Sequence, residues 1–149
     1  RPEIFGRQFL VDSRDEPVGE EERMLLAASF VTAEEAAKKA RELGGTAFPA
    51  HVDRDSYSLI ASLGAIPPEP DFHTAEISPQ GDPRALLRTN PELMGKLLLM
   101  DSDAHYLENM PDPAAWLELP ENTPQALIAV LNGELPARWY HPGWGEGGR

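Results

Sequence analysis

The sequence predicts an α/β fold in which most strands are parallel, and two observations lead to this prediction. Helical and strand patterns alternate along the chain, in the order helix, strand, helix, strand, helix, strand, helix, which is typical of βαβ units. The strand pattern at residues 97–100 is a continuous apolar run, as expected of a parallel strand that is buried on both faces. A parallel sheet or a βα-barrel accounts for both observations.

The clearest helix is predicted over residues 32–43. Thr32 and Glu35 stand at capping-box spacing, and two glycines follow the last turn, where glycine tolerates the left-handed conformation. Capping side chains, acidic first turns and prolines at the first helical position indicate further helices or single turns. These lie at residues 20–28, 55–63, 82–88, 90–95 and 123–131.

Short apolar or alternating segments between the helices predict the strands. They cover residues 46–50, 74–78, 97–100 and 117–119, with a strand or extended loop at 9–11 and a turn at 13–19. Pro49 removes one ladder donor and indicates a strand end. Residues 1–135 are predicted to form one barrel portion, and residues 136–149 a flexible tail rich in glycine and aromatic residues.

Composition excludes several function classes. The chain has 149 residues with 13 Lys and Arg against 25 Asp and Glu, a net charge of −12, which disfavours non-specific nucleic-acid binding and anionic membrane surfaces. The absence of cysteine excludes disulfides, thiolate metal sites and cysteine nucleophiles, and it is compatible with a cytoplasmic location. No apolar run approaches the ~20 residues of a spanning helix, so no membrane partner is expected.

Two predicted strands are followed by residue types that bind metal ions. His51 comes directly after residues 46–50, and Asp103 and His105 come shortly after residues 97–100. Functional side chains of parallel α/β folds gather past the carboxyl ends of the strands, so these three are expected to converge. Imidazole and carboxylate ligands together suit zinc, iron or manganese. The alternative is structural: a histidine bound to a backbone carbonyl, a loop or helix cap at Asp103, and an exposed His105.

Two further residues have weaker signals, and no catalytic side chain is assigned. Arg54 could hold a substrate phosphate with its guanidinium fork, or form a surface ion pair with Asp53 or Asp55. Glu76 could orient a ligand histidine by accepting its second N–H, or be a plain polar residue at a strand end.

Several of these segments resemble the polymerase-and-histidinol-phosphatase (PHP) superfamily. They are Ala-His-Val-Asp-Arg at residues 50–54 and Ser-Asp-Ala-His at residues 102–105, on either side of the strand that contains Glu76. Residues 2–8, 18–22, 43–45 and 49–54 are similar to one bacterial, uncharacterised branch of that superfamily. The similarity spans about residues 2–110.

The resemblance implies part of a metal-dependent phosphoesterase, with this chain as the later βα units of a distorted TIM-like (PHP) barrel. In that superfamily His, Asp and Glu side chains hold a cluster of metal ions, and a metal-bound hydroxide attacks phosphorus. His51 corresponds to the histidine of the third motif, and Asp103 and His105 to ligands of the fourth. The implied cofactors are divalent metal ions (zinc, manganese or iron), and the implied substrate is a phosphorylated small molecule or nucleotide.

The chain departs from the superfamily pattern at its start. The opening His-x-His motif and the second, histidine–glutamate motif have no counterpart among these residues, and His73 falls on the strand face opposite to Glu76. Because the chain starts at Arg1, we expect a processed start or a piece of a longer protein, inactive alone. It would pair with the upstream half of the barrel or self-associate through open apolar edges. The alternatives are another metallohydrolase of related barrel type, acting on a C–N bond, and a non-catalytic acidic interaction domain.

Overall fold

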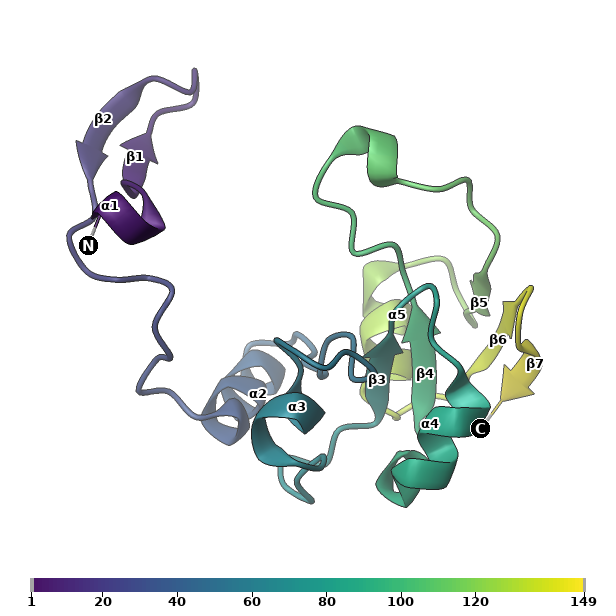
Figure 1. Cartoon of the computed structure of the whole chain (residues 1–149). Coiled ribbons are helices and arrows are strands. Elements are labelled where there is room, and N and C mark those ends of the chain that lie inside the picture. The colour runs from purple at the N-terminus through teal and green to yellow at the C-terminus, as the bar shows by residue number, and fades with distance from the viewer. Residues whose placement is uncertain (1, 149) are drawn as a thin grey trace. The chain divides into compact units, whose positions relative to one another are not determined.

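The computed structural model describes residues 2–148, and the chain divides into two compact units, residues 1–32 and 33–149. The first unit contains helix α1 (Pro2–Phe5) and an antiparallel hairpin of β1 (Phe9–Val11) and β2 (Pro17–Glu20) (Figure 1). The strand expected at residues 9–11 is therefore present. All residues of both strands are exposed, so the hairpin buries none of its apolar side chains within its own unit.

The helix predicted over residues 20–28 is not formed. The side-chain amide of Gln8 donates to the carbonyls of Glu21 and Arg23 at 2.9 and 2.7 Å, and its oxygen accepts from the N–H of Leu25 at 2.9 Å. A helix would have to pair these backbone groups internally. The predicted turn at residues 13–19 is also shorter than expected, because its last residues belong to β2.

The second unit contains the remaining elements (Figure 1). Its α-helices are α2 (Ala33–Glu42), α3 (Leu59–Leu63), α4 (Pro83–Thr89) and α5 (Pro124–Leu131), with 3₁₀ turns η1 (Pro91–Leu93) and η2 (Leu107–Asn109). Its strands are β3 (Thr74–Ile77), β4 (Leu97–Met100), β5 (Trp116–Glu118), β6 (Arg138–His141) and β7 (Gly145–Gly148).

Side-chain caps fix the starts of three of these helices. Asp82 accepts from the N–H groups of Arg84 and Ala85 at the start of α4, and Thr123 accepts from Ala126 at the start of α5, each before a proline. The cap-and-proline predictions at residues 82–83 and 123–124 are thus confirmed, whereas Asn90 makes no side-chain capping bond before the turn η1. Helix α3 starts later than expected, because Ser58 accepts from the N–H of Ala61 and takes the capping role expected of residues 55 or 56.

Strands β3 and β4 pair in parallel, with Glu76 opposite Leu99 and Ala75 opposite Leu98. Residues 46–50, predicted as a third strand, do not form one. Instead, the N–H of Glu76 donates to the carbonyl of Pro49 at 3.0 Å, and the N–H of Val52 donates to the carbonyl of Glu76 at 2.9 Å. Pro49 has no N–H to donate, and the hydrogen-bond ladder between this segment and β3 skips one residue at His51. The segment therefore lies beside β3 without becoming a regular strand.

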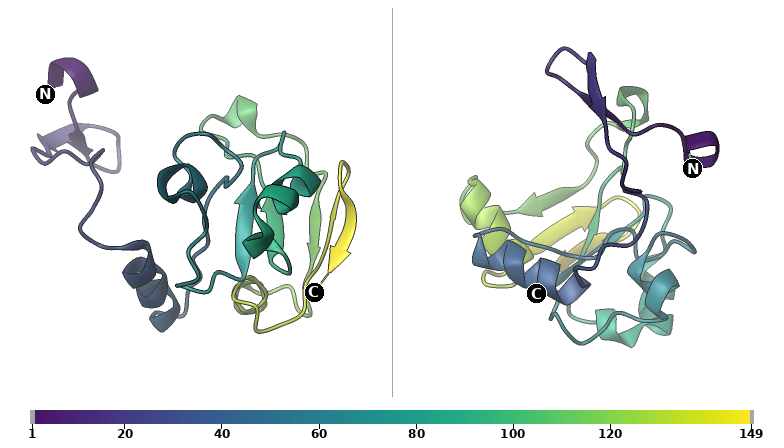
Figure 2. Two further views of the ribbon diagram at one scale, coloured as in Figure 1. Left: turned by 60° about the horizontal axis from the view of Figure 1, so that its bottom comes forward. Right: turned by 90° about the vertical axis from the view of Figure 1, so that its left-hand side faces the viewer.

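The β3–β4 pair is buried on both faces, as the apolar run at residues 97–100 predicts. Helices α4 and α5 lie on opposite sides of it (Figures 1 and 2). On the α4 side, Ala75, Ile77 and Leu98 pack in a cluster with Leu86. On the α5 side, Leu97 packs in a second cluster with Val130, Leu131 and Ala137.

The remaining strands form a three-stranded antiparallel sheet in the order β5, β6, β7. Where the sequence predicts a flexible tail, residues 138–148 form a hairpin, and Trp144 packs against the cluster on the α4 side. The fold is therefore α/β with one parallel pair. Residues 2–148 contain no closed barrel, and two of their three sheets are antiparallel. Within the same residues, no helix combines the length and apolar character needed to cross a bilayer.

Candidate functional site

His51 lies in the turn that interrupts the pairing of residues 46–52 with β3. Its φ of 29° is in the left-handed region, where a side chain other than glycine is uncommon. The backbone bonds of Pro49 and Val52 to Glu76 hold the turn on both sides, so His51 sits beside Glu76. Its ring Nδ1 is buried and has no hydrogen-bond partner among the described residues. This nitrogen therefore does not make the bond to a backbone carbonyl that the structural alternative would allow.

Glu76 occupies the middle of the buried parallel pair and is only 8% exposed. Its Oε1 is the second buried polar atom here that lacks a partner within residues 2–148. Burial raises the pKa of the Glu76 carboxyl, and interaction with Asp101 and the charge of Asp103 raise it further, whereas His51 lowers it. These opposing influences show that four side chains lie within electrostatic range: His51, Glu76, Asp101 and Asp103.

Asp101, Asp103 and His105 belong to the segment after β4. Asp103 has a φ of 46°, and its N–H donates to Oδ1 of Asp101 at 3.1 Å. His105 is exposed, and its Nδ1 lies 2.8 Å from the carbonyl oxygen of Asp103. The structure therefore brings His51 and Asp103 to the same carboxylate, Glu76. It places the ring of His105 against the local backbone, as in the structural alternative for that residue.

Arg54 forms its ion pair with Asp103, at 2.9 Å between Nη1 and Oδ2, and not with Asp53 or Asp55. Two hydrogen bonds fix the backbone of Arg54. Its N–H donates to the carbonyl of His51 at 3.0 Å, and its own carbonyl accepts from the hydroxyl of Ser58 at 2.8 Å. The Arg54 side chain therefore extends from the turn that contains His51, and its guanidinium contacts the segment after β4.

Sequence reasoning did not single out Asp101 or Asp53 as functional residues. No signal along the chain marks Asp101. Only the register between the strands does so: Leu99 is opposite Glu76, and Asp101 comes two residues further on the same face. Asp53 ties the His51 turn to the end of β3, because it accepts from the N–H of Ser78 at 2.8 Å and from the Ser78 hydroxyl. It acts through its neighbours as a positioning residue.

The residue types at these strand ends are ones that bind divalent cations, but the described residues do not assemble a ligand shell for one. Two buried atoms of such groups, Nδ1 of His51 and Oε1 of Glu76, have no hydrogen-bond partner in the part of the chain that the structure describes. Across residues 2–148, however, no three His, Asp or Glu side chains are grouped as a bound ion would require. Asp103 is held by Arg54 instead.

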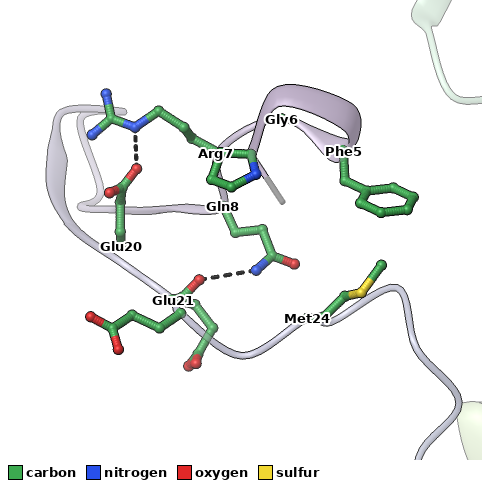
Figure 3. A pocket seen from close by; sticks show the side chains of 9 residues that line it. Phe5, Gly6, Arg7, Gln8, Glu20, Glu21 and Met24 are labelled. Atoms are coloured by element: carbon green, nitrogen blue, oxygen red, sulfur yellow. Dashed lines mark hydrogen bonds and ion pairs between the residues drawn. The ribbon is translucent and has the colours of Figure 1, made fainter.

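Two cavities lie away from these side chains. One, of about 250 Å³, is in the first unit, where Arg7 pairs with Glu20 and Gln8 bonds to the backbone of Glu21 (Figure 3). The other, of about 570 Å³, lies in the second unit between the loop that precedes α4 and the β6–β7 hairpin. Neither contains a residue that the sequence predicts as a metal ligand.

Comparison with known proteins adds no relative: no family model, curated protein or solved structure matches the chain.

Replacing Glu76 with glutamine is expected to stabilise the metal-free protein at pH 7. Because the pKa of Glu76 is raised on folding, its ionised form is disfavoured in the folded state. That penalty is absent below the ordinary glutamate pKa of about 4.3 and grows as pH rises through the higher folded value. Thermal unfolding in EDTA should show a higher Tm for Glu76→Gln at pH 7, with the difference disappearing near pH 4. A difference independent of pH would contradict this explanation.

Proposed function

We propose that this chain is part of a PHP-type metal-dependent phosphoesterase of the cytoplasm, which takes a phosphorylated small molecule or nucleotide as substrate. The observation that carries the proposal is a pair of buried atoms at the carboxyl edge of the parallel pair, Nδ1 of His51 and Oε1 of Glu76, which have no hydrogen-bond partner within residues 2–148. An unpartnered buried polar atom is costly, and such atoms persist where a site uses them. The carboxylates of Asp101 and Asp103 lie within electrostatic range of the same point.

The chain's own residues have distinct tasks in this proposal. His51, Asp103 and His105 are the proposed ligands. Glu76 is the proposed acceptor that would orient the His51 ring, a hydrogen bond that Nδ1 of His51 and Oε1 of Glu76 do not make among the described residues. These residues would hold a divalent metal ion, which would supply Lewis-acid chemistry toward a phosphoryl group. Arg54, once free of Asp103, offers a planar pair of donors to the remaining phosphate oxygens. His105 must turn away from the Asp103 carbonyl to become a ligand.

These residues are too few for a multinuclear centre, which fits a chain that forms the later βα units of a larger TIM-like barrel. The proposed missing ligands belong to an upstream half, and that half is also the proposed partner. Within the described residues β4 pairs with β3 alone, so its second edge is free for a neighbouring strand.

Metal binding is the first test of the proposal. Adding Mn²⁺ or Zn²⁺ to the EDTA-treated chain is expected to raise its Tm by several degrees, because a ligand that binds only the folded state stabilises it. His51→Ala and Asp103→Asn should abolish the shift. Asp112→Asn, an exposed carboxylate on the loop between β4 and β5, should keep it.

Product release separates the remaining enzyme candidates. We expect little or no phosphate from p-nitrophenyl phosphate with this chain alone, and release when the upstream half is added. Ammonia from an amide substrate would favour a C–N metallohydrolase instead. No metal-dependent shift with either ion would leave the histidines structural and the chain an acidic interaction domain.

A further inference from the structure

The cavity of about 570 Å³ in the second unit has tryptophan side chains in its wall. It lies between the loop that precedes α4 and the β6–β7 hairpin (Figure 1). Its apolar lining comes from Leu87, Leu98, Trp139 and Trp144. Both tryptophans are half-buried, so part of each indole remains accessible. A cavity of this volume accommodates a small organic ligand, and its aromatic wall favours a ligand with a flat apolar face.

Glycines leave the hairpin side of this cavity without side chains. Gly143, Gly145 and Gly147 all line it. An added Cβ at Gly147 would stand 2.4 Å from the indole of Trp139, its partner across the β6–β7 ladder, so the ring lies close against the backbone there. At Gly145 an added Cβ would meet nothing within 4 Å. The hairpin therefore offers an indole on bare backbone, with open space beside it.

His141 adds an uncharged ring to the aromatic wall. Its ring centroid lies 4.6 Å from that of Trp144, and its Nδ1 accepts from the N–H of Gly143 at 3.1 Å. Burial lowers the pKa of His141, so the neutral ring prevails at pH 7. Because Nδ1 accepts, the proton of the neutral ring is on Nε2, which can donate. The aromatic part of the cavity therefore carries no charge.

Polar side chains of both hydrogen-bonding types also line the cavity. Four of them are exposed: Gln80, Asp82, Arg84 and Glu146. Asp82 uses Oδ1 for both capping bonds of α4, so its Oδ2 takes no part in the cap. The two carboxylates can only accept, the guanidinium can only donate, and the amide does both. An anionic ligand would meet two carboxylates, and a cationic ligand would meet Arg84.

We propose that this cavity binds the ring of an uncharged sugar, with its apolar face on the tryptophans and its hydroxyl groups on the polar side chains. This inference goes beyond the proposed function and does not rest on it. A hydroxyl group both donates and accepts, so a sugar can bond to the carboxylates and to the guanidinium alike. The C–H groups on one face of a pyranose ring supply the apolar surface that an indole can bury.

Titration of the full 149-residue chain with the methyl glycosides of glucose, galactose and mannose tests the proposal. At least one of these sugars is expected to bind with a Kd of about 1 mM. Binding should change the tryptophan fluorescence, because Trp139 and Trp144 line the cavity. Trp116→Phe should keep the change, because Trp116 stacks on Tyr140.

Two substitutions in the lining test the contacts to the hydroxyl groups. Glu146→Ala and Arg84→Ala should each weaken sugar binding about tenfold, since each removes a charged hydrogen-bonding group. Glu121→Ala and Arg88→Ala are the matched controls, at exposed residues of the same type, and should bind as the wild type does. Calorimetry measures the affinities, and circular dichroism checks that each variant is folded.

Three results would overturn the proposal. The first is that none of the three sugars binds at about 50 mM, far above the expected Kd. The second is that the Glu146 and Arg84 variants bind sugar as tightly as the wild type, which would place binding elsewhere. The third is that choline or AMP binds more tightly than every sugar, which would show that the cavity takes an organic ion.

Discussion

Replacing Leu97 with alanine is expected to lower the free energy of unfolding by about 3 kcal/mol, since a buried leucine loses its transfer energy and leaves a cavity. Leu97 is 0% exposed and packs with Val130, Leu131 and Ala137, which join β4 to α5 and its following segment. The cavity would lie at the start of β4, four residues before Asp101.

Urea titration of the two proteins measures this loss. Leu107→Ala is the matched control, because it removes the same atoms from a residue that is 86% exposed. Leu107→Ala should change the free energy of unfolding by no more than about 0.5 kcal/mol. Equal losses at both positions would show that the α5 side of the sheet is not packed as described.

Gly133→Ala is expected to lower the free energy of unfolding by more than Gly64→Ala does. Both glycines follow a helix with φ in the left-handed region, 77° and 85°, where an alanine costs about 1 kcal/mol or more. An added Cβ at Gly133 would stand 2.6 Å from the His73 ring, whereas at Gly64 it would meet nothing within 4 Å. The clash should add about 2 kcal/mol at Gly133.

Chemical denaturation gives the free energy of unfolding of each variant. The difference between the two values separates the effect of the contact with His73 from that of the backbone strain. A similar cost at both sites would mean that the His73 ring moves aside freely. A larger cost at Gly133 would show that α5 and the segment before β3 are packed tightly together.

Local signals in the sequence predict much of the second unit. The pairs Asp82-Pro83 and Thr123-Pro124 carry their own capping geometry, and the apolar run at residues 97–100 needs cover on both faces wherever it is placed. Predictions failed where a distant residue decides the outcome. The side chain of Gln8 takes the backbone groups that a helix near residue 24 would need.

In the candidate site too, local sequence signals predict some residues, whereas contacts between distant residues are missed. Residue type and position after a strand singled out His51 and Asp103, and both lie within range of Glu76. Asp101 was missed because its role depends on the register of β4 against β3, which no local pattern reveals. The partner of Arg54 was also missed, since Asp103 lies 49 residues away along the chain.

The exposure of the loop between β4 and β5 bears on which parts of the chain can change in sequence. Residues 105–116 are all exposed, whereas Asp101 is set by the paired strand just before them. Substitutions within residues 105–114, which precede β5, are therefore expected to have little effect on the packing of β4. Sequence change can therefore accumulate on this exposed segment while the acidic residues at the strand end keep their places.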